Sequence, residues 1–208
     1  MTPKELGYYF PAEWTKHTST WLSYPHNQKS WLGELQKMLP YYREFIKALA
    51  ENEKVNINVN NEQAKQDLEK ELEKIDCNMN NVCFHLFVTN DAWLRDNGPA
   101  FVVNGKEKAI VNWNFNAWGE KYKYELDNKI PQQIADYLNV KMFSPNIIME
   151  GGSVDFNGKG DVITTKSCLL NKNRNSHLSQ QEIEKKLCDN YGVDNVIWLS
   201  EGLKGDDT

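Results

Sequence analysis

Two short segments of this 208-residue chain gather side chains that could bind a cation. The first, residues 89–99 (TNDAWLRDNGP), places the carboxylates of Asp91 and Asp96 beside Trp93 and Arg95. A carboxylate can pair bidentately with a planar guanidinium, and an indole ring can lie against the face of such a cation. The alternative is a surface turn whose Asp side chains cap backbone amides and whose Arg pairs with a neighbour, and composition alone favours this turn.

The second segment, residues 149–153 (MEGGS), places Glu150 at the end of an apolar strand and before two glycines. Gly151 and Gly152 would let another backbone or a ligand approach closely, because they carry no side chain. The alternative is a bulge or turn at a sheet end with an exposed Glu150, and the local sequence favours this alternative. The segment is not a phosphate loop, because it lacks the GxxxxGK[ST] pattern.

The cysteines and histidines form no recognisable reactive motif. No CxxC pair, no zinc-like Cys/His spacing and no defensible Ser/His/Asp or Cys/His order is present. Buried, inert thiols are expected for the cysteines that fall in predicted strands or helices, and the histidines are isolated from one another. These residues are Cys77, Cys83, Cys168, Cys188, His17, His26, His85 and His177.

Composition narrows the class of protein. Hydrophobic residues make up 40% and charged residues 25%, as in globular proteins. A net charge of −5 argues against a nucleic-acid surface and allows a cationic ligand. No apolar run reaches the roughly 20 residues of a membrane span, and no secretory leader is visible. We therefore expect a cytoplasmic protein with reduced thiols, no membrane association and no nucleic-acid partner.

Strands alternate with helices along the whole chain. The first half predicts strands at 20–24, 55–59 and 82–89, a helical stripe at 32–49, and a charged helix capped by Asn60 or Asn61. Pro40 lies within the stripe, so the helix either kinks or begins there. The strand at 82–89 carries Val82, Phe84, Leu86 and Val88 on one face and His85 on the other.

Two hairpins stand out in the second half. Asn104-Gly105 joins strands at 100–103 and 109–115, and Asn157-Gly158 joins strands at 154–156 and 162–165. A helix follows each hairpin, one near Pro131 and one after a Ser179/Glu182 capping box, and a last strand spans 195–200. The pattern predicts an α/β protein with mixed or several small sheets, in a single domain over 1–208.

Several segments, in order, resemble the agmatine deiminases and the related bacterial peptidylarginine deiminases. They are FPAEWTKHTSTWLSYPHN, NDAWLRDNGPAFVVN, WNFNAWGEKY, IMEGGSVDFNGKGDVITTKSCLL, NKNRN and the closing GLKGDDT. The resemblance runs from Phe10 to Thr208 and implies the pentein fold, a five-bladed α/β propeller of ββαβ units, with about three of the five blades here. It also implies hydrolysis of a guanidinium group through a covalent Cys thiouronium intermediate.

The resemblance assigns roles to three residues. Asp96 is implied as the carboxylate that binds the guanidinium nitrogens, and Glu150 as a second acid close to the guanidinium and the catalytic His. Trp93 is implied as a substrate-binding wall, whereas Arg95 resembles a structural ion-pair partner. We expect agmatine as the small-molecule substrate, no metal or organic cofactor, and a homodimer.

The chain departs from the family pattern at its end. The family's His-x-Asp segment and nucleophilic Cys follow the GDDT-like stretch, and this chain ends at Thr208. We therefore expect a domain truncated at its C-terminus and inactive as it stands. The alternatives are a peptidylarginine deiminase-like hydrolase that acts on C-terminal arginine, and a non-catalytic truncated pentein that binds a guanidinium compound or a protein.

Overall fold

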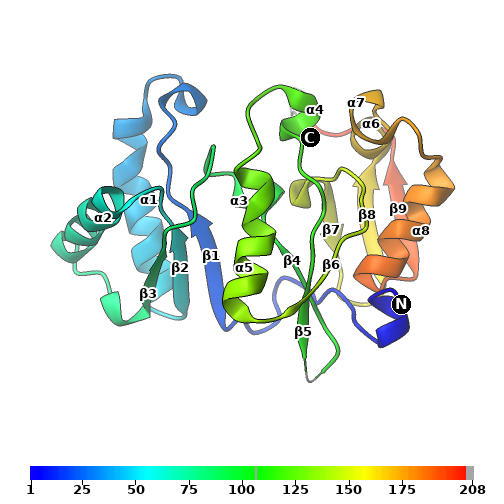
Figure 1. Cartoon of the computed structure of the whole chain (residues 1–208), viewed down its shortest axis with the longest axis horizontal. Helices are drawn as coiled ribbons and strands as arrows, with labels where there is room; N and C mark the ends of the chain where they lie inside the picture. The colour runs from blue at the N-terminus through cyan, green and yellow to red at the C-terminus, as the bar shows by residue number, and fades with distance from the viewer. Residues whose placement is uncertain (106, 205–208) are drawn as a thin grey trace. The chain divides into compact units, whose positions relative to one another are not determined.

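The computed structural model describes residues 1–105 and 107–204, and these residues form two compact units. One unit comprises Lys16–Leu94, and the other comprises Met1–Thr15 together with Arg95–Thr208. Residues 205–208 of the GLKGDDT motif lie outside the described residues. Figure 1 shows the elements of each unit.

The Lys16–Leu94 unit is a three-stranded parallel sheet with the strand order β1-β2-β3. Its elements are β1 (Ser19–Ser23), η2 (Gln28–Trp31), α1 (Leu35–Ala50), β2 (Lys54–Asn58), α2 (Glu62–Lys74), η3 (Met79–Asn81) and β3 (Val82–His85). Alternating apolar residues of β2 pack with the inward faces of both helices, in a core that includes Ile46, Val55, Ile57 and Leu72. Asn61 caps α2 by accepting a hydrogen bond from the Ala64 amide at 2.8 Å, as predicted for one of the two asparagines.

The other unit contains two sheets that repeat one order of elements (Figure 1). In each, an antiparallel hairpin is followed by a helix and by a third strand parallel to the second. The first set is β4 (Ala100–Val103), β5 (Lys108–Val111), α5 (Ile130–Leu138) and β6 (Lys141–Phe143); the second is β7 (Val154–Phe156), β8 (Asp161–Thr165), α8 (Gln180–Tyr191) and β9 (Asn195–Leu199). Both predicted hairpins and the α/β class with mixed small sheets are confirmed.

Short helical turns connect these elements. They are η1 (Lys4–Leu6), α3 (Leu94–Asn97), α4 (Ala117–Glu120), η4 (Asp127–Lys129), η5 (Gly151–Ser153), α6 (Lys166–Leu169) and α7 (Lys172–Asn175). One core joins both sheets of this unit and includes Val111, Met149, Val162, Leu187 and Tyr191. The predicted capping box of Ser179 and Glu182 is present at the start of α8.

The structure decides one open alternative and corrects one prediction. Helix α1 begins at Leu35 and passes through Pro40, so of the two possibilities at the proline, a helix that begins there is excluded. Strand β3 ends at His85, and Leu86 and Val88 beyond it are exposed. His85 lies on the face opposite Phe84, as predicted. It is buried, its ring is hydrogen-bonded to Asn56 at 3.0 Å, and it stacks on Trp21.

Candidate functional site

The structure brings the two predicted acidic segments together. The Gly152 amide donates a hydrogen bond to Asp96 Oδ1 at 3.0 Å. A Cβ atom on Gly152 would lie 2.2 Å from that oxygen, and one on Gly151 would lie 2.2 Å from the Arg95 carbonyl oxygen. Both glycines are therefore needed for η5 to pack against α3, as the sequence predicted.

Glu150 is held at the end of a short apolar segment that is hydrogen-bonded on two sides. Asn114 pairs with the Ile147–Met149 backbone, donating to the Ile147 carbonyl and accepting from the Met149 amide. Asn175 accepts from the Ile148 amide at 2.9 Å and donates to its carbonyl at 2.7 Å, so its carboxamide replaces a neighbouring strand. Because the backbone is fixed on both sides, the direction of the following Glu150 side chain is fixed as well.

Glu150 is completely buried and ion-paired. Arg174 Nε donates to Glu150 Oε1 at 2.7 Å, and the Arg174 side chain is 3% exposed. The Cys168 thiol donates to Glu150 Oε2 at 3.5 Å. The alternative of an exposed Glu150 is therefore wrong, and the buried carboxylate has the cationic partner that burial demands.

Asp96 is only partly buried and has a different environment. Its pKa is raised from 3.8 to about 6, mainly by burial and also by the nearby Glu150 carboxylate, although hydrogen bonds from Gly152 and Trp118 lower it. Arg95 also lowers the pKa, but its guanidinium pairs with Glu13. Arg95 therefore forms a structural ion pair, as expected from the sequence. Asp96 is thus a carboxylate held by neutral donors, and a cation would stabilise its charge.

Cys168 is a protonated thiol at neutral pH. Burial, and then the Glu150 carboxylate, raise its pKa from 9.0 to about 12. Burial also raises the pKa values of Cys77 and Cys188. All four cysteines are free thiols. The expectation of an inert Cys168 agrees with this environment, since only the thiolate is a strong nucleophile.

Trp93 belongs to the Lys16–Leu94 unit, whereas Asp96 and Glu150 belong to the other. Its side chain is 39% exposed and stacks on Trp31 with ring centroids 5.4 Å apart. The Trp31 segment is tied to the Trp93 loop by Asp91, whose carboxylate accepts hydrogen bonds from Asn27 and Ser30. Asp91 therefore has a local structural role in holding this aromatic pair.

Sequence reasoning missed Arg174 and Trp118 as parts of the site. Nothing in the sequence indicated a role for Trp118, yet its indole donates to Asp96. Arg174 lies in the NKNRN segment, which carried the resemblance without a role for its arginine. A buried acid needs a cation, so an arginine in a segment otherwise rich in asparagine was the available signal.

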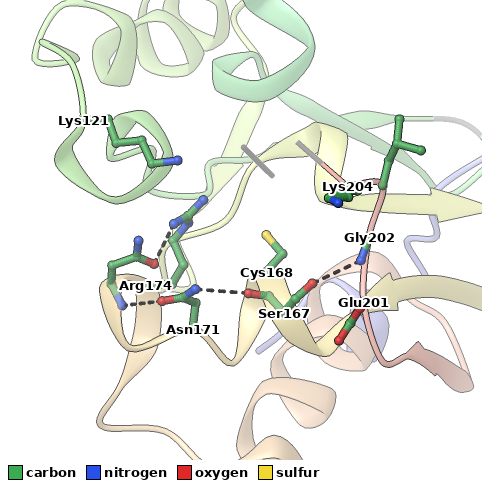
Figure 2. Close-up of a pocket in the computed structure, with 10 residues that line it drawn as sticks. Lys121, Ser167, Cys168, Asn171, Arg174, Glu201, Gly202 and Lys204 are labelled. Carbon is green, nitrogen blue, oxygen red and sulfur yellow. Dashed lines mark hydrogen bonds between the residues drawn. The ribbon is translucent and has the colours of Figure 1, made fainter. Parts of the chain in front are cut away.

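A pocket of about 600 Å³ opens beside the Arg174 and Cys168 side chains. Figure 2 shows Lys121 and Arg174 on one side of it and Glu201, Gly202 and Lys204 on the other. Its remaining lining is polar apart from Leu203 and the Cys168 thiol: Ser167, Asn171 and Asn173. The pocket therefore reaches two of the side chains that hold Glu150.

The described residues contain neither a metal-binding cluster nor a helix that could span a membrane. Within residues 1–105 and 107–204, no three His, Cys, Asp or Glu side chains are grouped so as to hold a metal ion. None of the helices in this part of the chain has the length and apolar character needed to cross a membrane.

Comparison with known proteins gives consistent matches. The family model described as Porphyromonas-type peptidyl-arginine deiminase matches residues 9–208. The chain is 37% identical to an agmatine deiminase of Ectopseudomonas mendocina and 35% identical to one of Pseudomonas syringae pv. tomato. Each alignment covers 100% of this chain and 56% of the relative.

Solved structures match in the same way. The agmatine deiminase of Enterococcus faecalis superposes with a TM-score of 0.88 at 32% identity, over 97% of this chain and 55% of that one. A Cys-to-Ser variant of the C. jejuni agmatine deiminase with substrate bound superposes with a TM-score of 0.83 at 34% identity, over 94% and 57%. The chain thus spans little more than half the length of the proteins it matches.

Proposed function

Because this chain belongs to the Porphyromonas-type peptidyl-arginine deiminase family, we propose that the complete protein that contains it hydrolyses the guanidinium group of agmatine. The products are N-carbamoylputrescine and ammonia. The relatives named agmatine deiminase match the whole of this chain, which supports agmatine as the substrate.

The observation that carries the proposal is the contrast between the two acids. The charge of Glu150 is matched by Arg174, whereas Asp96 receives hydrogen bonds from the Gly152 amide and the Trp118 indole, which are neutral. The raised pKa of Asp96 means that its ionised form is poorly stabilised. A guanidinium is permanently charged and offers paired N–H donors, so it is the ligand that Asp96 lacks.

Asp96 would bind and orient the guanidinium nitrogens, and Glu150 would orient the catalytic His and adjust its pKa. A thiolate would attack the guanidinium carbon, ammonia would leave, and water would release the ureido product from the thiouronium intermediate. The Cys-to-Ser variant of the C. jejuni relative with bound substrate supports a cysteine nucleophile.

We place that cysteine and the histidine outside these 208 residues and propose that this chain alone is inactive. The support is local. Cys168 is buried and protonated, and burial raises the pKa values of Cys77 and Cys188 as well. His177 lies outside the His-x-Asp segment in which the family resemblance implies the catalytic His.

Trp93 is proposed as an aromatic wall against the flat cation. Its partial exposure and its stacking on Trp31 support this role, because a preordered, accessible indole can receive a cation on its face. We also propose that the three sheets are three of five blades in one pentein domain, and that the complete protein is a homodimer.

A second candidate substrate is an arginine at the C-terminus of a peptide, and the description of the family model supports a peptidyl-arginine substrate in general. Ammonia release by the complete protein should be compared for agmatine and for peptides ending in arginine, each at several concentrations. A higher kcat/KM for agmatine supports the first proposal. A higher value for the peptides would replace it with the second, and ammonia from neither would refute both.

A further inference from the structure

The turn that carries Trp118 is left-handed. The φ angles of Ala117, Trp118, Gly119 and Glu120 are 49°, 58°, 94° and 64°. Left-handed helical backbone costs about 1–2 kcal/mol for each residue that bears a Cβ, and only glycine adopts it freely. Three such residues within four positions therefore persist only because their surroundings hold them.

Asn116 provides the first constraint on this turn. Its Oδ1 accepts a hydrogen bond from the Gly119 amide at 2.9 Å, and its carbonyl accepts one from the Glu120 amide at 2.6 Å. The Asn116 side chain is buried, and its Nδ2 donates to the Asn173 carbonyl of α7 at 3.0 Å. One carboxamide thus closes the turn and attaches it to α7.

Gly119 provides the second constraint. A Cβ at this position would lie 2.2 Å from Asn173 Nδ2 and 3.0 Å from Arg174 Nη1. The turn therefore packs directly on the two α7 side chains, and Asn173 Oδ1 accepts a hydrogen bond from Arg174 Nη1 at 2.7 Å. Gly119 is required both for its φ angle and for this approach.

Residues of α7 therefore contact Glu150 directly and Asp96 through the turn that carries Trp118. Arg174 binds Glu150 directly, and Asn173 supports the turn from which Trp118 binds Asp96. We propose that Asn116, Gly119 and Asn173 are positioning residues that hold the left-handed turn on α7, so that the Trp118 indole donates to Asp96. The consequence for catalysis rests on the proposed function, whereas the positioning of Asp96 does not.

The attachment of the left-handed turn to α7 affects how readily Asp96 ionises. The groups that act on its charge are the Glu150 carboxylate, Arg95, the Gly152 amide and the Trp118 indole. Because the Trp118 hydrogen bond lowers the pKa of Asp96, its loss raises that pKa above about 6. A turn with a purely structural role would change stability without this shift.

The test substitutes Gly119→Ala in the complete protein, with Gly105→Ala as the matched control. Both glycines have a positive φ, 94° and 85°, so both variants carry backbone strain. Nothing lies within 4 Å of a Cβ on Gly105, so only Gly119→Ala collides with α7. If Gly119→Ala does not fold, Asn116→Asp replaces it: this variant keeps the acceptor for the Gly119 amide and loses the donor to Asn173.

The first readout is the indole N–H resonance of Trp118, assigned by its loss in Trp118→Phe. In the unsubstituted protein its chemical shift should titrate near pH 6, and Asp96→Asn should abolish the titration. Gly119→Ala should raise the midpoint by about half a unit or more, the effect of losing one hydrogen bond to the charged form. Gly105→Ala should leave it unchanged. Equal behaviour of the two Ala variants, or no titration of Trp118, would overturn the proposal.

The second readout is the pH dependence of KM for agmatine. Weaker binding should begin at higher pH in Gly119→Ala than in Gly105→Ala, since substrate binding needs ionised Asp96. If the resonance behaves as expected while neither the unsubstituted protein nor any variant releases ammonia, the positioning proposal stands and the proposed function fails. An acid limb at the same pH in both variants would contradict the link to catalysis.

Discussion

Replacing Asp96 with Asn should remove a loss of folding stability that the protein suffers as the pH rises to neutral. The pKa of Asp96 is about 6 in the folded chain against an ordinary value of 3.8. Between these values the folded state binds more protons than the unfolded state, so stability falls as pH rises. A difference of about 2 units at about 1.4 kcal/mol each corresponds to a fall of about 3 kcal/mol.

The assay measures the free energy of unfolding by urea at pH values from about 4.5 to 8, for the unsubstituted protein and for Asp96→Asn. About two thirds of the fall, or about 2 kcal/mol, belongs to this range. The Asn carbonyl can still accept from Gly152, and any other change in hydrogen bonding is independent of pH. The stability of the variant relative to the unsubstituted protein should therefore increase by about 2 kcal/mol from pH 4.5 to 8.

Parallel stability curves would refute this reasoning, because they would mean that Asp96 ionises as easily in the folded protein as in the unfolded one. A variant that loses relative stability as pH rises would reverse the sign. Glu13→Gln serves as a control for the loss of one negative charge, because the Glu13 carboxylate forms an exposed ion pair with Arg95.

Three further predictions follow from the same contacts. Arg174→Met should destabilise the protein by about 3–5 kcal/mol in urea unfolding, because it leaves Glu150 buried without a cation, and adding Glu150→Gln should recover part of the loss; no recovery would contradict the ion pair's role. Cys168→Ser should keep the activity of the complete protein within about tenfold, since its protonated thiol is only a donor to Glu150, and a loss as large as that of a nucleophile would refute this. Ser179→Ala should cost about 1 kcal/mol of unfolding free energy by removing the capping box of α8, and an unchanged urea midpoint would count against the cap.

The sequence predicted the local elements because their signals are local. Asn-Gly pairs mark the two hairpins, and the Ser179/Glu182 box marks the start of α8. The strand prediction failed at Leu86 and Val88, where alternation continues past the last paired residue of an edge strand. Pairing depends on β2, and nothing in the strand's own sequence records where that partner ends.

The candidate site was predictable in part for the same reason. Two glycines after an acid indicated a close approach, and Asp96 is what approaches them. The ion pair of Glu150 with Arg174 and the left-handed turn at Trp118 join residues far apart in the sequence. Positive φ at Ala117 and Trp118 contradicts the preference of both residue types, so no propensity could have indicated it.

The most direct test of the central claim is ammonia release from agmatine by the complete protein and by its Asp96→Asn and Glu150→Gln variants, each first shown to be folded. We expect turnover by the unsubstituted protein and a loss of at least about a hundredfold in kcat/KM for each variant, since each removes a charge that acts on the guanidinium or the catalytic His. Turnover within tenfold of the unsubstituted value in Asp96→Asn would contradict the assignment of Asp96 as the carboxylate that binds the substrate cation.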